Sequence, residues 1–335
     1  MLINKEVIFK LLALSIGIGL SLFLGELVSR VFYFGKDGLS IEKVNSFVPL
    51  GLSGLIKEHE NKKVLYELKP NLDSYFKLKE FRTNSQSLRD KEYTIKKPYN
   101  TKRGVVIGDS FTMGSGVDIE DVYHSMVEKA LNEQGDSIKF ELINFGVGGY
   151  NLLNYLGVLE AKVLKYSPDF IIIGFCGVND FRNPSEKHYA GEFKPQEKVR
   201  FQFFLERLVQ RANFTKPKRR GGRNPITKSE KKFTDTMFNE FRVYSDKHAI
   251  PIIIQYLSII PNNENLTTIK GLAEKNGLYF LDSDGKFDNK ELKKYFIVPG
   301  LDPHPNRLAN SIFANTLLSY QPFMDILYQR ETKDN

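Results

Sequence analysis

Residues 103–112 read Arg-Gly-Val-Val-Ile-Gly-Asp-Ser-Phe-Thr. The β-branched run at 105–107 is typical of a buried parallel strand, and it stops abruptly at Gly-Asp-Ser, residues 108–110. Open α/β sheets carry their reactive groups at the carboxyl ends of such strands. A serine there, just before an expected helix, can expose its hydroxyl and its own N–H group. Ser110 is therefore a candidate nucleophile, provided that the chain also supplies a base, an orienting acid and oxyanion donors.

The unit of strand, glycine-containing turn and helix repeats along the chain. After the strand at 104–108, further strands are expected at 139–144, 170–175, 250–256 and 278–281. Helices are expected at about 119–134, 151–166, 229–247 and 306–320. Asp118 is a plausible N-cap for the first of these helices. A repeating unit of this kind implies right-handed crossovers and a parallel sheet covered on both faces, so the sequence predicts an α/β fold.

The amino-terminal segment 1–34 is strongly apolar. No charge occurs from Leu11 to Gly25, and apolar residues resume at 31–34. Together these residues are long enough to span a bilayer, which takes about 20 residues. The alternatives are a secretory signal peptide, for which no good cleavage site follows, and an ordinary buried amphipathic helix. We expect an uncleaved single-pass anchor in the cell membrane, with the amino end inside and the catalytic domain extracytoplasmic.

Residues 35–97 are mixed in composition, and we expect a connector that packs on the main domain at 98–328. Within the connector, residues 76–83 alternate in part and predict a strand. An insertion at about 181–228 interrupts the α/β repeat after a strand's carboxyl end, where it could form a lid.

The net charge of +8 resides in one segment, because residues 185–232 carry 14 Lys/Arg against 5 Asp/Glu. The Arg-Gly-Gly-Arg piece at 220–223 could suggest RNA binding. The other interpretations are a mobile solvated loop and contact with anionic lipid headgroups. We expect no nucleic-acid partner.

Cys176 is the only cysteine, so neither an intramolecular disulfide nor a cysteine-based zinc site can form. Its apolar surroundings indicate a buried structural thiol. The Gly-Val-Gly-Gly loop at 146–149 lacks the spacing of a dinucleotide-binding loop. We therefore expect no cofactor and no metal.

Four short loops carry the candidate chemistry, at 108–111, 146–149, 177–180 and 302–306. His304 can take the proton of Ser110 and return it to the leaving group, and Asp302 can hold the imidazole in the right tautomer. The oxyanion donors would be the N–H groups of Ser110 and Gly149 and the side-chain amide of Asn179.

Two positions in these loops need a separate comment. Glycine at 149 lets the backbone approach the substrate closely. Asp109 is adjacent to the nucleophile, but we expect it to stabilise the turn and not to act as the acid.

Taken in order, the four loops resemble the blocks of the SGNH/GDSL hydrolase family. The residues at its four namesake positions are Ser110, Gly149, Asn179 and His304. The resemblance covers about residues 98–325, and residues 81–90 also resemble the stretch that precedes the nucleophile strand in membrane-anchored bacterial members. It implies a flavodoxin-like three-layer α/β/α sandwich with a parallel sheet, no cofactor, and ester hydrolysis or acyl transfer through an acyl-serine.

The acid departs from the family's common pattern. Many members place it three residues before the histidine, where this chain has Leu301, whereas Asp302 is two residues before. The two-residue offset resembles relatives that O-acetylate exopolysaccharides. Asp302 is the expected acid, with Asp282 and Asp284 as alternatives.

The leading hypothesis is a membrane-anchored serine esterase or O-acyltransferase that acts on acyl (acetyl) esters of an extracytoplasmic glycan. A lipase, lysophospholipase or thioesterase is the alternative within enzymes, because the aromatic residues at 201–204 could cover an acyl chain. An alternative of another class is a catalytically silent module for glycan binding or envelope assembly. The expected partners are an acylated carbohydrate or lipid substrate and, through the N-terminal helix, the membrane.

Overall fold

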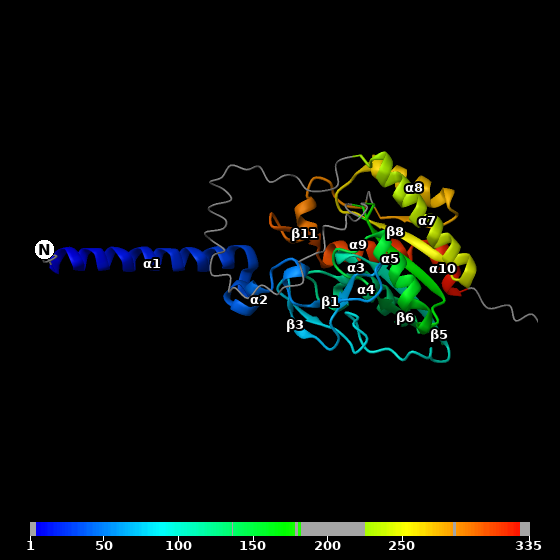
Figure 1. Cartoon of the computed structure of the whole chain (residues 1–335), viewed down its shortest axis with the longest axis horizontal. Coiled ribbons are helices and arrows are strands. Elements are labelled where there is room, and N and C mark those ends of the chain that lie inside the picture. The colour runs from blue at the N-terminus through cyan, green and yellow to red at the C-terminus, as the bar shows by residue number, and fades with distance from the viewer. Residues whose placement is uncertain (1–4, 136, 178–179, 182–224, 284–285, 329–335) are drawn as a thin grey trace, which may run out of the picture.

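The computed structural model describes residues 5–135, 137–177, 180–181, 225–283 and 286–328. The long helix α1 (Lys5–Phe34) projects away from the α/β part of the protein (Figure 1). Most of the insertion predicted at 181–228 lies outside the described residues, and so does Asn179.

The centre of the described structure is a five-stranded parallel sheet. Its members are β5 (Thr101–Gly108), β6 (Lys139–Asn144), β7 (Phe170–Cys176), β8 (Ile252–Leu257) and β9 (Tyr279–Asp282). The strand order is β6-β5-β7-β8-β9, which is the flavodoxin-like order 2-1-3-4-5. The predicted fold class is confirmed. The chain passes from β5 to β6 on one side and then crosses to β7 on the other, so the strand order reverses at β5. Ligands bind at the carboxyl ends of the strands at such a point.

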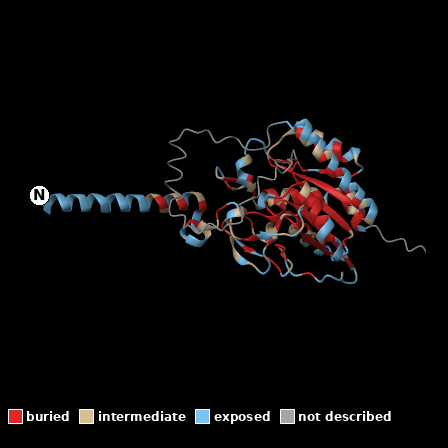
Figure 2. Ribbon diagram, viewed as in Figure 1, coloured by how far each residue is buried: buried red, intermediate tan, exposed pale blue. Residues whose placement is uncertain are grey.

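Helices cover both faces of the sheet because successive side chains of a strand point to opposite sides. Val105 and Ile107 belong to one apolar cluster, whereas Val106 belongs to the other. The first layer is formed by α5 (Leu152–Val158), α7 (Lys228–His248) and α8 (Asn263–Lys275). The second is formed by α4 (Tyr123–Asn132), α9 (Arg307–Leu318) and α10 (Gln321–Tyr328). Figure 2 shows the buried sheet between these layers.

The helices differ from the prediction in two places. The helix predicted at 119–134 is divided into a 3-10 turn, η3 (Ile119–Asp121), and α4. Asp118 makes no side-chain cap, because its carboxylate pairs with Lys79 at 2.7 Å instead. Helix α8 was not predicted, although a parallel connection between β8 and β9 requires a crossover.

The helix predicted at 151–166 continues from α5 through η4 (Leu159–Val163) and η5 (Leu164–Tyr166). It begins with a capping box at Asn151 and Asn154. Asn154 Oδ1 accepts the backbone N–H of Asn151, and Asn151 Oδ1 accepts that of Leu153, each at 2.9 Å.

The segment 35–97 contributes short helices and two hairpins. Its helical turns are η1 (Gly35–Leu39), α2 (Ile41–Asn45) and η2 (Leu50–Leu52). Its antiparallel strands are β1 (Ile56–Glu58) with β2 (Tyr66–Leu68) and β3 (Asp73–Phe76) with β4 (Lys79–Arg82). The strand predicted at 76–83 is confirmed as β4 at 79–82 but begins later, because the chain reverses at Lys77 and Leu78, where φ is 52° and 74°.

Helix α1 is long and apolar enough to cross a membrane. Its apolar side chains are exposed over most of its length, whereas one side of its carboxyl end, with Glu26, Arg30 and Phe34, is buried (Figure 2). There Arg30 Nε pairs with Glu26 at 2.7 Å, and η1 folds back over the last turn. A small apolar cluster then joins the base of the helix to the α/β part. Its buried members are Phe34, Val44, Phe47, Leu78 and Val298.

Candidate active site

Ser110 lies at the first position of the short helix α3 (Ser110–Met113), directly after β5. Asp109 is the N-cap, and its Oδ1 accepts the N–H of Phe111 at 2.8 Å. Asp109 thus stabilises the turn, as expected. The first N–H groups of a helix have no carbonyl partner within it, so the N–H of Ser110 is not used inside α3.

Arg89 supports the far end of this helix from inside the protein. Its fully buried guanidinium donates to the carbonyl oxygens of Met113 (2.9 Å), Gly114 and Val117 (2.7 Å). Burial lowers the pKa of Arg89 to about 10. The last carbonyls of a helix need partners from outside it, so Arg89 fixes the turn that carries Ser110.

His304 and Asp302 come from one strand, β11 (Asp302–Pro305), which pairs with β10 (Phe296–Val298). His304 Nε2 lies 2.9 Å from Ser110 Oγ, and its Nδ1 contacts Asp302 Oδ1. The same carboxylate oxygen accepts the backbone N–H of His304 at 3.0 Å. The structure therefore brings the three predicted residues into the arrangement of a nucleophile, a base and an orienting acid.

The carboxylate of Asp302 is buried and has both oxygens occupied. Its Oδ2 accepts from Lys77 Nζ at 2.6 Å. Burial alone would raise the pKa of Asp302, but the hydrogen bond and charge of His304, followed by those of Lys77, hold it well below its ordinary value. Of the alternative acids, Asp282 is exposed at the end of β9, and Asp284 lies outside the described residues.

The loop at 146–149 reaches the nucleophile from the neighbouring strand. A Cβ added at Gly148 would lie 3.6 Å from Ser110 Cβ and 3.1 Å from a methyl group of Leu50. Tyr66 fixes the loop by donating to the carbonyl of Gly148 at 2.9 Å. Gly149 has a φ of +85°, and a Cβ there would lie 2.8 Å from the hydroxyl of Tyr66. The oxyanion roles of Gly149 and Asn179 remain predictions.

Asp109, Cys176 and Asp180 place potential metal ligands near one another at the ends of β5 and β7, and all three are buried. Asp180 Oδ2 accepts from the hydroxyl of Tyr155 at 2.8 Å and from the N–H of Cys176 at 2.7 Å. Burial, and next the charge of Asp109, raise the pKa of Asp180. Asp180 therefore joins the end of β7 to Tyr155 of α5. Cys176 is buried and forms no disulfide, as predicted.

Sequence reasoning missed Lys77, Arg89 and Tyr66. Arg89 lies in the block at 81–90, which resembles the stretch before the nucleophile strand in membrane-anchored family members. Nothing in the sequence of that block indicates a buried side chain next to the nucleophile turn. Lys77 gave no signal at all, because its contact with Asp302 joins positions 225 residues apart.

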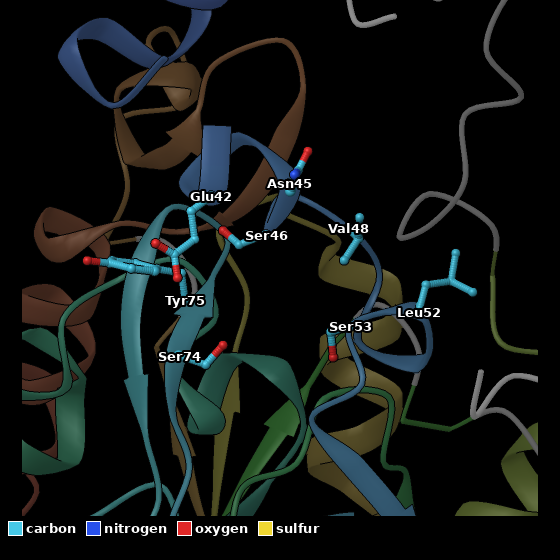
Figure 3. A pocket seen from close by; sticks show the side chains of 8 residues that line it. All are labelled: Glu42, Asn45, Ser46, Val48, Leu52, Ser53, Ser74 and Tyr75. Atoms are coloured by element: carbon cyan, nitrogen blue, oxygen red, sulfur yellow. The ribbon is translucent and has the colours of Figure 1, made fainter. Parts of the chain in front are cut away.

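A polar hollow of about 200 Å³ lies next to these elements (Figure 3). Its lining residues are Glu42, Asn45, Ser46, Val48, Leu52, Ser53, Ser74 and Tyr75. The carbonyl of Ser46 accepts the N–H of Lys77 at 3.0 Å, so one wall continues to the partner of Asp302. Val48, Leu52 and Ser53 form another part of the lining. Leu50, in the same segment, lies beside Gly148 of the loop at 146–149.

Comparison with known proteins places the chain among hydrolases. Residues 106–240 match the model of the GDSL-like Lipase/Acylhydrolase family. None of the curated proteins matches the sequence.

Solved structures that match part of the chain include a two-domain esterase active on acetylated mannans, with 17% identity and a TM-score of 0.43 over 67% of this chain and 49% of that one. Axe2, an acetylxylan esterase from Geobacillus stearothermophilus, has 17% identity and a TM-score of 0.41 over 65% and 92%. LAE5, an α/β hydrolase from the metagenome of Lake Arreo, Spain, has 18% identity and a TM-score of 0.42 over 65% and 93%. The chain spans about half the length of the two-domain esterase.

The family match begins inside β5 and includes the nucleophile turn, and the sheet that carries this turn has the flavodoxin-like order. The predicted resemblance to the SGNH/GDSL hydrolase family is therefore confirmed for residues 106–240.

Proposed function

We propose that this protein is a serine esterase that works through an acyl-serine on Ser110. One observation carries the proposal, namely the line of contacts from Ser110 Oγ to His304 Nε2, at 2.9 Å, and from His304 Nδ1 to Asp302. A serine hydroxyl is a weak nucleophile until a base accepts its proton, and a base is effective when a third group fixes its tautomer. The family match over residues 106–240 supports the same chemistry.

In the proposed reaction, Ser110 Oγ bonds to the acyl carbon of the ester while its proton moves to His304 Nε2. The carbonyl electron pair moves onto oxygen, where the N–H groups of Ser110 and Gly149 and the amide of Asn179 are the proposed donors. The bond to the alcohol oxygen then breaks as His304 returns the proton to it. Water repeats these steps on the acyl-serine and releases the carboxylic acid.

We propose an acylated glycan, and in particular its acetyl esters, as the substrate. The hollow in Figure 3 supports this choice, because Glu42 offers a carboxylate, Ser74 a hydroxyl and Tyr75 an aromatic ring in one small space. Sugar hydroxyls need several donors and acceptors at once, which an apolar acyl-chain pocket would not provide. Attack on the acyl-serine by a sugar hydroxyl in place of water would make the same site an O-acyltransferase.

Helix α1 is the proposed membrane anchor, with the catalytic part outside the cytoplasm. Its length and apolar surface support the anchor. Because Phe34 at its base shares an apolar cluster with Val298, the candidate active site would lie close to the membrane surface.

The test uses the full-length protein in detergent, beside Ser110→Ala. The wild type should hydrolyse p-nitrophenyl acetate at least about 1,000-fold faster than the variant, since loss of a triad member costs several orders of magnitude. Equal rates would remove the esterase assignment. Failure of a fluorophosphonate probe to label Ser110 in the folded protein would favour the silent binding module instead.

A series of substrates separates the remaining alternatives. The proposal predicts a preference for acetyl over long acyl chains, and for a sugar acetate over a lysophospholipid or an acyl thioester. A preference for long chains would point to a lipase. Appearance of the acyl group on an added oligosaccharide, instead of release as free acid, would identify a transferase.

A further inference from the structure

We propose that Lys77 is a positioning residue of the active site, because its ammonium group holds the carboxylate of Asp302 in the orientation that binds His304. This inference rests on the proposed function, since it assigns a partner to the acid of that reaction. It also makes the segment 35–97, which precedes the family match at 106–240, a working part of the site.

The contact is short and shielded from water. Lys77 Nζ lies 2.6 Å from Asp302 Oδ2, and the two side chains are only 13% and 4% exposed. The other oxygen of the carboxylate binds both Nδ1 and the backbone N–H of His304. With one oxygen held on each side, the carboxylate cannot rotate away from the imidazole without breaking a buried ion pair, whose loss is costly.

Few other charged groups face this carboxylate in the described part of the chain. His304 faces it from its own strand, and Lys77 faces it from the turn between β3 and β4. The carboxylate of Asp109 contacts the nucleophile, with 3.4 Å between its Oδ2 and Ser110 Oγ. The ring of Phe47 lies against the ammonium group, with 4.7 Å between Lys77 Nζ and the ring centroid.

The backbone at Lys77 adopts a conformation that its residue type does not favour. Two-residue turns with two positive φ angles ordinarily take Asn and Gly, yet this one has Lys77 and Leu78. Ser46 supports the turn, because its carbonyl and its hydroxyl oxygen accept the N–H groups of Lys77 and Leu78, each at 3.0 Å. The unfavourable turn lets Leu78 enter the apolar cluster while Lys77 reaches Asp302. Strain retained at such a site is consistent with a functional demand on the side chain.

Lys77 has two consequences for the proposed reaction. When His304 accepts the proton of Ser110, the imidazolium needs an ionised and correctly oriented partner. The cation contributes to the lowered pKa of Asp302, and the hydrogen bond fixes its plane. Lys77 acts on the reacting atoms only through Asp302 and His304, so it positions the base without touching the ester.

The test measures p-nitrophenyl acetate hydrolysis by the full-length protein in detergent, across pH. Lys77→Met should lower kcat about 10- to 100-fold with little change in KM, because the base is no longer well aligned. The pH of half activity on the acidic side should rise by about half a unit or more, since the Asp302–His304 pair holds a proton more tightly without the cation. Lys77→Arg should restore most of the activity and the wild-type acidic limb.

Lys79→Met is the matched control. Lys79 is on the same hairpin, but it pairs at 2.7 Å with the partly exposed Asp118, so its loss should leave both kcat and the pH profile unchanged.

Two results would overturn the inference. One is a folded Lys77→Met protein with wild-type kcat and acidic limb. The other is a loss of kcat with an unmoved acidic limb, which a merely structural role would produce. If Lys77→Met does not fold, Lys77→Gln takes its place. It keeps a hydrogen-bond donor but removes the charge, so the acidic limb should still rise while kcat falls less. Failure of the proposed function itself is recognised separately, by equal rates of the wild type and Ser110→Ala.

Discussion

The ring of Phe34, the last residue of α1, packs on the ring of Phe47 with 4.9 Å between their centroids. Phe47 also lies under the ammonium group of Lys77, whose partner is Asp302. A continuous set of contacts thus runs from the base of α1 to the proposed catalytic acid. In Figure 1, β11 accordingly lies on the side of the α/β part that faces α1.

The first prediction concerns this chain of contacts. Phe47→Ala should lower the free energy of unfolding by about 3–5 kcal/mol, as is usual for a buried phenylalanine, and should also lower kcat because Lys77 loses its support. Phe47→Leu, which keeps most of the apolar volume, is the control for packing. The measurements are thermal unfolding and p-nitrophenyl acetate kinetics, and wild-type kcat in a folded Phe47→Ala protein would contradict the coupling.

The second prediction concerns Asp302. Asp302→Asn should lower kcat by about 1,000- to 10,000-fold, because the imidazole loses the partner that selects its tautomer. Asp282→Asn, at the alternative position, should retain activity. A reversed result would identify Asp282 as the acid.

Asp302 also predicts a pH dependence of stability. Its pKa is lowered in the folded protein, so the ionised carboxyl stabilises the fold above its unfolded pKa of about 4, and this contribution is lost as the pH falls. The wild type should therefore exceed Asp302→Asn in unfolding free energy at pH 7 by about 1 kcal/mol or more, and the difference should shrink towards pH 2. A difference that stays constant with pH in denaturant titrations would contradict this.

The third prediction concerns Gly149. Gly149→Ala introduces a side chain at a φ of +85° and 2.8 Å from the hydroxyl of Tyr66, so the loop beside the nucleophile must shift. We expect about a 100-fold loss of kcat. Gly271→Ala is the matched control, because α8 has open space at that position, and alanine should raise the stability by about 0.5–1 kcal/mol. Full activity of Gly149→Ala would argue against a role of this loop in the reaction.

The fourth prediction concerns Arg89. Arg89→Met should lower the free energy of unfolding by about 3–5 kcal/mol, because buried carbonyls at the end of α3 lose their donor. If the protein stays folded, labelling of Ser110 by a fluorophosphonate should slow markedly. Arg82→Met removes an exposed arginine from the neighbouring strand and should change neither property.

The fifth prediction concerns the hollow in Figure 3. Tyr75→Ala and Glu42→Gln should raise KM for an acetylated oligosaccharide about tenfold while leaving p-nitrophenyl acetate hydrolysis unchanged, since the small substrate does not reach that space. Unchanged KM for the oligosaccharide in both variants would exclude the hollow as its binding site.

Much of the architecture could be predicted because it depends on short-range pattern. The apolar runs that became β5, β6 and β7 are local, and their order with the helices implied a parallel sheet. Asp302 and His304 also form a local pattern. Residues two apart on a strand share a face, so β11 brings both to the same side.

The sequence alone determined the class of fold, the candidate nucleophile and the candidate base, because these follow from buried strands that end in short polar loops. Only the tertiary structure decided what surrounds them. The turn at Lys77 carries neither glycine nor asparagine, and its conformation depends on Ser46 and on the cluster around Phe47. Contacts between positions more than 200 residues apart leave no periodic trace in a single sequence, so the partner of Asp302 emerged only once the chain was folded.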